Sequence, residues 1–163
     1  MKKNIFSILL LVCMMATLFV PVYAAEPIVT ETELEVRSTN VEYFEDGSYL
    51  VTTIKETPSS RATVYSKSGS KDITLYNSDD EIQWIYTLVG TYTVETGVSA
   101  VCTNSTFRYT IYVDKWSLTD HSNSYSGNVA YGTAVFKKKV LFITTSTQEI
   151  DAHVACDAYG VIS

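Results

Sequence analysis

The residues best suited to acid–base chemistry are two histidines, His121 and His153. His153 follows Asp151 by two residues in an alternating stretch, so on a strand the two side chains would share a face. Such a pair can serve as a general base, but an exposed surface pair is the commoner arrangement. The chain has no G-x-S-x-G motif that would supply a nucleophile. His121 lies in the polar stretch 119–124, which predicts a solvated loop. We therefore expect no catalytic residues and no enzymatic activity.

Metal-binding motifs are also missing from the sequence, which contains neither H-E-x-x-H nor C-x-x-C. The run Asn77-Ser78-Asp79-Asp80-Glu81 offers several oxygen ligands that calcium could use. It lacks the ligand spacing and the central glycine of an EF-hand loop, so a polar hairpin turn is the better interpretation. The sequence predicts no metal site and no cofactor.

Binding is the more plausible use of the surface, because the chain has twelve tyrosines, whose rigid rings make good contact surfaces. Tyr112, on the outward phase of a predicted strand, and Tyr125, in a serine-rich loop, are the candidate ligand-binding tyrosines. Lys137, Lys138 and Lys139 form a basic cluster that could meet an anionic wall polymer or the acidic part of the same chain. Lysines at a strand end also protect an edge strand from pairing. The net charge of −6 argues against nucleic acid as a partner.

The first 24 residues have the pattern of a secretory signal peptide. Lys2 and Lys3 precede an apolar run over 5–20. Small or compact residues stand three and one before the bond between Ala24 and Ala25, namely Val22 and Ala24, and they predict cleavage there. A transmembrane anchor would need about 20 apolar residues, and this run has sixteen. A lipid-modified Cys13 is the weaker alternative, because Val12 and the mid-run position depart from the lipobox pattern. We expect a secreted, extracellular protein, alternatively one held at the cell surface, with no membrane span after cleavage.

Removal of residues 1–24 would leave two cysteines, Cys102 and Cys156, and a net charge of −8. An even pair in an exported protein predicts one disulfide. Closing a loop of this length would stabilise the fold by roughly 4 kcal/mol in the chain-entropy model. Two separate buried thiols are the alternative.

The remaining chain divides near residue 60. Residues 25–60 carry eight acidic residues against two basic ones, and we expect them to form a flexible acidic leader. Within it, Asp46-Gly47 between β-prone runs predicts a hairpin over 41–54 with a type I′ turn. Residues 61–163 would form the folded domain.

That domain shows period-two alternation and no sustained helical period. Trp84 and Trp116 fall on apolar faces and are expected in the core. Stretches with strand character are 82–94, 108–114, 129–136, 140–145 and 150–156, and polar turns lie at 68–70, 77–80, 96–97 and 122–127. Strands at this spacing predict an all-β fold, an antiparallel two-sheet β-sandwich, with a small β-barrel as the alternative.

Several short stretches of the sequence, taken together, resemble those of a known protein family. They are Asp46-Gly47-Ser48-Tyr49, Lys67-Ser68-Gly69-Ser70-Lys71, Tyr76-Asn77-Ser78, Trp84, Gly90-Thr91-Tyr92-Thr93, Trp116 and Ser126-Gly127-Asn128. In this order they resemble a family of small secreted β-rich proteins of Gram-positive bacteria whose function is unknown. Asp79-Asp80-Glu81 departs from the glycine that the resemblance leads one to expect near that turn. The resemblance implies export and a β-domain, and it transfers no activity.

Together these features predict an exported, non-enzymatic binding module that acts at or near the bacterial cell surface. Its candidate partners are a cell-wall glycan, an anionic polymer or a surface protein. The alternative from another class is a secreted antagonistic effector, similar to a bacteriocin or toxin, whose acidic leader is a pro-segment removed near Arg61.

Overall fold

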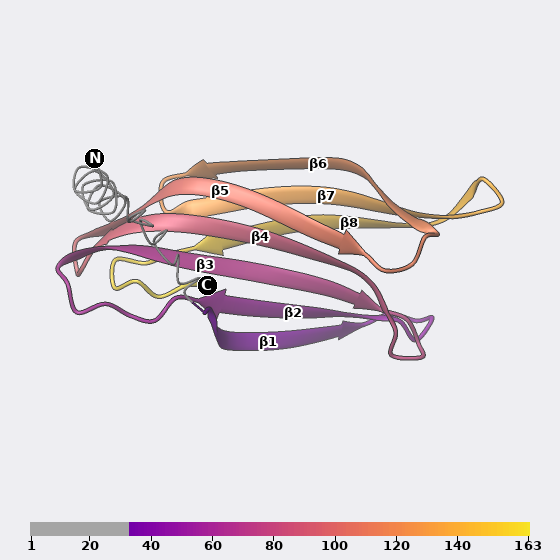
Figure 1. Cartoon of the computed structure of the whole chain (residues 1–163), viewed down its shortest axis with the longest axis horizontal. Helices are drawn as coiled ribbons and strands as arrows, with labels where there is room; N and C mark the ends of the chain where they lie inside the picture. Colours follow the sequence, from indigo (N-terminus) through magenta and orange to yellow (C-terminus); the bar gives the residue numbers. More distant parts are fainter. Residues whose placement is uncertain (1–32) are drawn as a thin grey trace, which may run out of the picture. The chain divides into compact units, whose positions relative to one another are not determined.

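A computed structural model describes residues 33–163 of the chain (Figure 1). The predicted signal peptide and its cleavage site at Ala24 and Ala25 lie outside the described residues, as do residues 25–32 of the predicted leader. Residues 33–163 form one compact unit. Its eight strands are β1 (Glu35–Tyr43), β2 (Tyr49–Glu56), β3 (Val64–Tyr76), β4 (Ile82–Glu95), β5 (Ser99–Ile111), β6 (Trp116–Ser126), β7 (Val129–Val140) and β8 (Ile143–Ala155).

The strands form two antiparallel sheets in which every neighbour in the sheet is also the neighbour in sequence. The larger sheet has the order β1-β2-β3-β4-β5 and the smaller sheet has the order β6-β7-β8. Residues 112–115 carry the chain from one sheet to the other. The predicted all-β class is confirmed, and the sheets of residues 33–163 do not close into the alternative small barrel.

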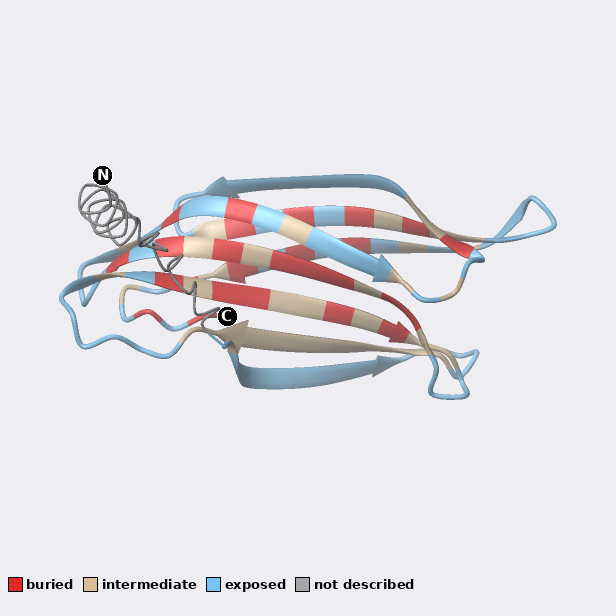
Figure 2. Ribbon diagram, viewed as in Figure 1, coloured by how far each residue is buried: buried red, intermediate tan, exposed pale blue. Residues whose placement is uncertain are grey.

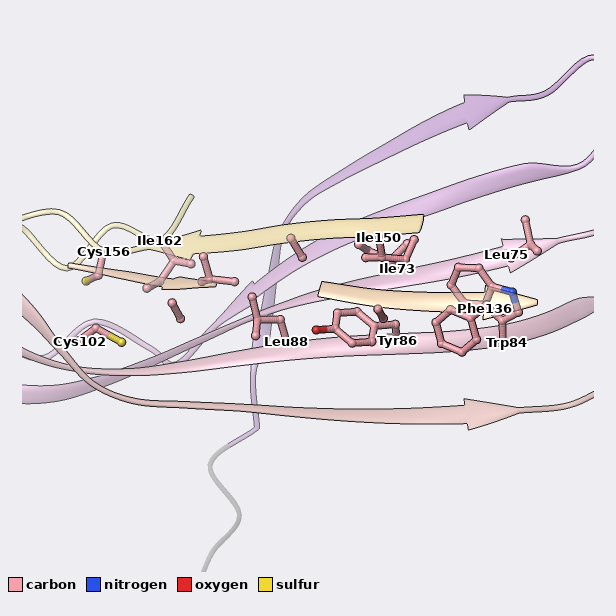
Figure 3. Packing of buried hydrophobic residues seen from close by; sticks show 14 of the residues in the cluster. Ile73, Leu75, Trp84, Tyr86, Leu88, Cys102, Phe136, Ile150, Cys156 and Ile162 are labelled. Atoms are coloured by element: carbon pink, nitrogen blue, oxygen red, sulfur yellow. The ribbon is translucent and has the colours of Figure 1, made fainter. Parts of the chain in front are cut away.

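Large side chains of β4 fit against small residues of the opposite sheet. Trp84, Tyr86 and Leu88 alternate along β4, are fully buried and face the core, as the sequence predicts (Figure 3). On β7 a Cβ atom added at Gly132 would collide with the Tyr86 hydroxyl and a Leu88 methyl group. The glycine is therefore required by the close approach of the two sheets.

The stretch expected to be a flexible leader is instead structured over residues 35–56. β2 pairs with β3 along its whole length, and Leu50 and Ile54 on its inner face pack against the core. β1 is exposed throughout and is held by its backbone pairing with β2 (Figure 2). The boundary expected near residue 60 thus falls inside one compact unit, because the apolar face of β2 extends the core beyond β3.

The hairpin predicted over 41–54 is present, but its turn is not of type I′. Tyr43 pairs with Tyr49, and the intervening residues 44–48 form the turn. Type I′ requires positive φ at both central residues, whereas only Gly47 of this turn has one, at 81°. The Gly47 N–H donates to the Phe44 carbonyl at 3.1 Å, which closes a longer turn.

Candidate functional site

Four connections between strands gather at one end of the molecule, which we call the tip end. They are the β1–β2 turn (44–48), the β3–β4 turn (77–81), the β5–β6 connection (112–115) and the β7–β8 turn (141–142). They appear together at the right in Figure 1, where the β7–β8 hairpin reaches farthest. The meander brings residues that are distant in sequence to this single edge of both sheets.

A pocket of about 180 Å³ opens at the tip end and takes side chains from both sheets. Its lining combines amides, hydroxyls, two aromatic rings and one charge of each sign. The amides belong to Asn77, Gln83 and Gln148, and the hydroxyls to Ser48, Ser78 and Ser146. The aromatic rings are those of Tyr76 and Trp116, the charged residues are Asp46 and Lys138, and Leu75 is the aliphatic residue. Such a surface suits a polar ligand that carries hydroxyl or amide groups and an apolar face.

Hydrogen bonds fix the amide and the indole in this lining. The Trp116 indole Nε1–H donates to Gln83 Oε1 at 3.3 Å, and Gln83 Nε2 donates to the Glu81 carbonyl at 3.1 Å. The Lys138 Nζ lies 5.9 Å from the centroid of the Trp116 ring, within the range of a cation–π contact. The sequence analysis expected Trp116 in the core. It is buried there, and it also lines the pocket.

The pocket's carboxylate is held in its charged form. Asp46 Oδ1 accepts a hydrogen bond from the Ser48 hydroxyl at 2.5 Å and one from the Ser48 N–H at 3.0 Å. These bonds lower the pKa of Asp46 below its ordinary value, and the positive charge of Lys138 lowers it slightly further. The pocket therefore offers a carboxylate and an ammonium group to the same ligand.

A row of three tyrosines extends from the pocket to the edge of the larger sheet. Tyr43, Tyr49 and Tyr76 are cross-strand neighbours on β1, β2 and β3. The Tyr49 and Tyr76 rings stack with centroids 4.8 Å apart, and the Tyr43 and Tyr49 rings are 5.4 Å apart. Tyr43 is 73% exposed, and Tyr76 lines the pocket. We call these residues the tyrosine row.

The middle ring of the tyrosine row is anchored to the β3–β4 turn. The Tyr49 hydroxyl donates to Asp80 Oδ1 at 2.8 Å, and this bond to a carboxylate raises the pKa of Tyr49 to about 12. Asp80 has a φ of 62°, so it takes the left-handed conformation that a glycine would adopt with less strain. This is the turn where the sequence departs from the expected glycine.

The oxygen-rich run 77–81 is used by the turn itself. Asn77 Oδ1 accepts hydrogen bonds from the backbone N–H groups of Asp79 and Glu81 at 3.0 and 2.8 Å, and Asn77 Nδ2 donates to Glu81 Oε2 at 2.9 Å. Within residues 33–163 no group of three or more His, Cys, Asp or Glu side chains is arranged to hold a metal ion.

The structure does not bring all of the sequence-predicted site residues together. Lys138 lines the pocket, and Tyr112 lies at the tip end, where its N–H donates to the Gln83 carbonyl at 3.0 Å. Tyr125 lies near the far end of β6, nine residues from Trp116, which places it about 30 Å away along the strand. It belongs to β6 and not to a loop.

Sequence reasoning missed the tyrosine row and Gln83. One signal could have indicated the row, since Tyr76 directly precedes the predicted turn at 77–80 and Tyr43 and Tyr49 lie within three residues of the predicted Asp46-Gly47 turn. Nothing in the sequence places Ser146 and Gln148 beside the β1–β2 turn.

The histidines lie on different strands. His121 is on β6 and not in a loop, and its ring lies 4.6 Å from that of Phe107. His153 and Asp151 are exposed on β8, where they pair with Tyr131 and Thr133 of β7.

The predicted disulfide is not present, because Cys102 and Cys156 are both free and buried. They lie at the same end of the core (Figure 3), where their backbone N–H groups donate to Gly127 and Asn128 at 2.8 and 3.0 Å. Each thiol has its own local acceptor, the carbonyl of Asn104 for Cys102 and that of Asp157 for Cys156. Both sulfurs therefore behave as core side chains.

We expect both thiols to resist labelling in the folded protein. Burial raises the pKa of Cys102 and raises that of Cys156 to about 11, so little reactive thiolate forms at pH 8. A colorimetric thiol titration of the protein without residues 1–24 and without reductant should detect almost none when folded and two in denaturant. Two thiols that appear only after reduction would instead reveal a disulfide.

No family model, curated protein or solved structure matches the chain. The resemblance to small secreted proteins of Gram-positive bacteria therefore stays a prediction from the motifs alone. Among the described residues no helix is long and apolar enough to cross a bilayer.

Proposed function

We propose that this protein is an exported, non-enzymatic β-sandwich module that binds a cell-wall glycan at or near the bacterial surface. The observation that carries the proposal is the continuity of the pocket with the tyrosine row through Tyr76. Amides and serine hydroxyls match the hydrogen-bonding groups of a sugar, and aromatic rings pack against the C–H face of a sugar ring. The pattern of a signal peptide in residues 1–24 supports export.

The dimensions of the site support a chain-like ligand. The pocket is smaller than the roughly 300 Å³ at which sites for drug-sized ligands begin, so it suits one sugar residue or one chain end. The tyrosine row offers further stacking positions outside the pocket, toward the edge strand β1. Asp46 and Lys138 at the pocket would favour a sugar that carries an amide or a charged substituent.

The alternative hypothesis, a secreted effector whose acidic leader is a pro-segment, has less support than the binding module. Cleavage near Arg61 would remove β1 and β2. Of these, β2 pairs with β3 and packs Leu50 and Ile54 against the core. Loss of these strands would expose Ile73 and Leu75, which are now buried. A pro-segment can be removed without destabilising the mature domain only where it contributes nothing to the core of that domain.

Co-sedimentation with purified cell wall and insoluble neutral polysaccharides, at low and high salt, tests the proposal. We expect binding that resists salt and that weakens about fivefold or more in Tyr43→Ala, since an exposed aromatic contact contributes about 1 kcal/mol. Tyr125→Ala is the matched control, because this ring is also exposed but lies at the far end of β6. The glycan proposal fails if nothing binds, or if both variants lose binding equally.

A further inference from the structure

The turn between β7 and β8 presents four consecutive apolar side chains to solvent. Leu141 is 85% and Phe142 100% exposed, and Val140 and Ile143 on either side are also exposed. The hairpin projects beyond the other turns of the tip end (Figure 2). Exposed apolar groups that lie next to one another mark interaction surfaces, because they contribute nothing to the core.

The backbone of this turn is unfavourable for the residues that it contains. Val140 pairs with Ile143, so the loop has two residues, and both have positive φ, 49° for Leu141 and 69° for Phe142. A two-residue turn of this kind strongly prefers Asn-Gly or Asp-Gly. Backbone strain and exposed apolar surface therefore coincide at Leu141 and Phe142. This combination points to a role of the two side chains in binding and not in folding.

Four lysines lie near the base of this turn. Lys137, Lys138 and Lys139 lead into it, and the Lys139 N–H donates to the carbonyl of Lys115 at 2.8 Å. None of these four lysines forms an ion pair with another described residue. Lys137, Lys138 and Lys139 form the longest basic run in a chain of net charge −6, and they lie next to the most exposed apolar side chains of residues 33–163.

We propose that the β7–β8 hairpin inserts shallowly into an anionic lipid bilayer. Leu141 and Phe142 would enter the boundary between headgroups and acyl chains, while the lysines remain at the level of the lipid phosphates. Lys139 precedes the turn residue Leu141 by two residues, or about 7 Å along the strand, which lies within the depth of about 5–10 Å reached by interfacial apolar groups. Anionic lipid attracts each nearby lysine.

A protein partner fits this feature less well. A stable protein interface buries about 800 Å² on each side, whereas this apolar surface is the narrow end of one hairpin. A bilayer needs no matching flat patch, and its surface charge complements the lysines. The inference does not depend on the proposed glycan binding.

Flotation of the protein lacking only residues 1–24 with lipid vesicles provides the test. We expect binding to vesicles of equal parts phosphatidylglycerol and phosphatidylcholine, and at least tenfold weaker binding to phosphatidylcholine alone. Lys139→Gln should weaken binding about fivefold, which corresponds to about 1 kcal/mol for each lysine near the membrane surface.

The double variant Leu141→Asn/Phe142→Gly separates membrane contact from folding. Asn-Gly suits the positive φ angles, so the melting temperature should be unchanged or higher, while binding to anionic vesicles should fall at least tenfold. Its co-sedimentation with cell wall should be unchanged, which keeps this test distinct from that of the glycan. The proposal is overturned if the wild-type protein does not float with anionic vesicles. It is equally overturned if the double variant floats as well as the wild type. It is also overturned if the wild-type protein self-associates and the double variant loses only that self-association.

Discussion

Replacement of Glu56 by alanine should lower the free energy of unfolding by about 3–5 kcal/mol, because it leaves a buried ammonium group without its counter-charge. The Lys67 side chain is 0% exposed and its Nζ lies 3.5 Å from Glu56 Oε2. Its other described partner is the Thr57 carbonyl, which is neutral. Glu56 also accepts a hydrogen bond from the Ile162 N–H at 3.2 Å and pairs with Arg37 at 3.4 Å. One carboxylate thus connects β1, β3 and the C-terminal segment.

Urea unfolding followed by circular dichroism would measure this loss as a lower midpoint at an unchanged slope. The double variant Glu56→Ala/Lys67→Met is the control, because it removes the buried charge together with its partner. We expect it to recover much of the lost stability, because the buried site can accommodate methionine, an apolar side chain of similar length to lysine. A single variant within 1 kcal/mol of the wild type would contradict the account, and so would a double variant no more stable than the single one.

Trp84→Ala should cost about 3–5 kcal/mol and should also disturb the pocket. The Trp84 side chain is fully buried, stacks on Phe136 with ring centroids 4.2 Å apart, and meets the edge of Trp116 at 6.2 Å. Truncation of such a residue removes apolar contacts and leaves a cavity. Because Trp116 lines the pocket, its indole would lose one of the surfaces that position it.

Trp84→Phe is the matched variant for this position. The Trp84 indole Nε1 has no hydrogen-bond partner among the described residues, so phenylalanine sacrifices no such bond and keeps an aromatic ring against Phe136. We expect it to cost clearly less than alanine and to preserve the near-ultraviolet circular dichroism of Trp116. Equal destabilisation by the two substitutions would show that ring packing is not what makes Trp84 important.

The parts of the fold that sequence reasoning predicted best are those with one apolar and one polar face. The alternation of Trp84, Tyr86 and Leu88 identifies β4 because burial of one face repeats every second residue. Local side-chain chemistry is sufficient for these features.

Most of β1, before residue 41, and most of β6 were not predicted, because these strands are held mainly by their neighbours. β1 is exposed along its whole length, and the serine-rich half of β6 is also exposed, so neither has an apolar face to reveal it. Their backbone groups bond to β2 and β7, which the sequence of either strand does not encode. The lysine run was expected between two strands, yet β7 continues through it to Val140, and the turn forms at Leu141 and Phe142 without any turn-favouring residue.

The sequence by itself determined the all-β class, the core face of β4 and the hairpin around Asp46-Gly47, because each follows from local periodicity or turn chemistry. Only the tertiary structure decided the pocket, which joins residues as distant as Asp46 and Gln148, and the alignment of the tyrosine row across three strands. It also decided that Cys102 and Cys156 remain free thiols. These features depend on strand register and on how one sheet lies over the other, which are set by the packing of the whole core.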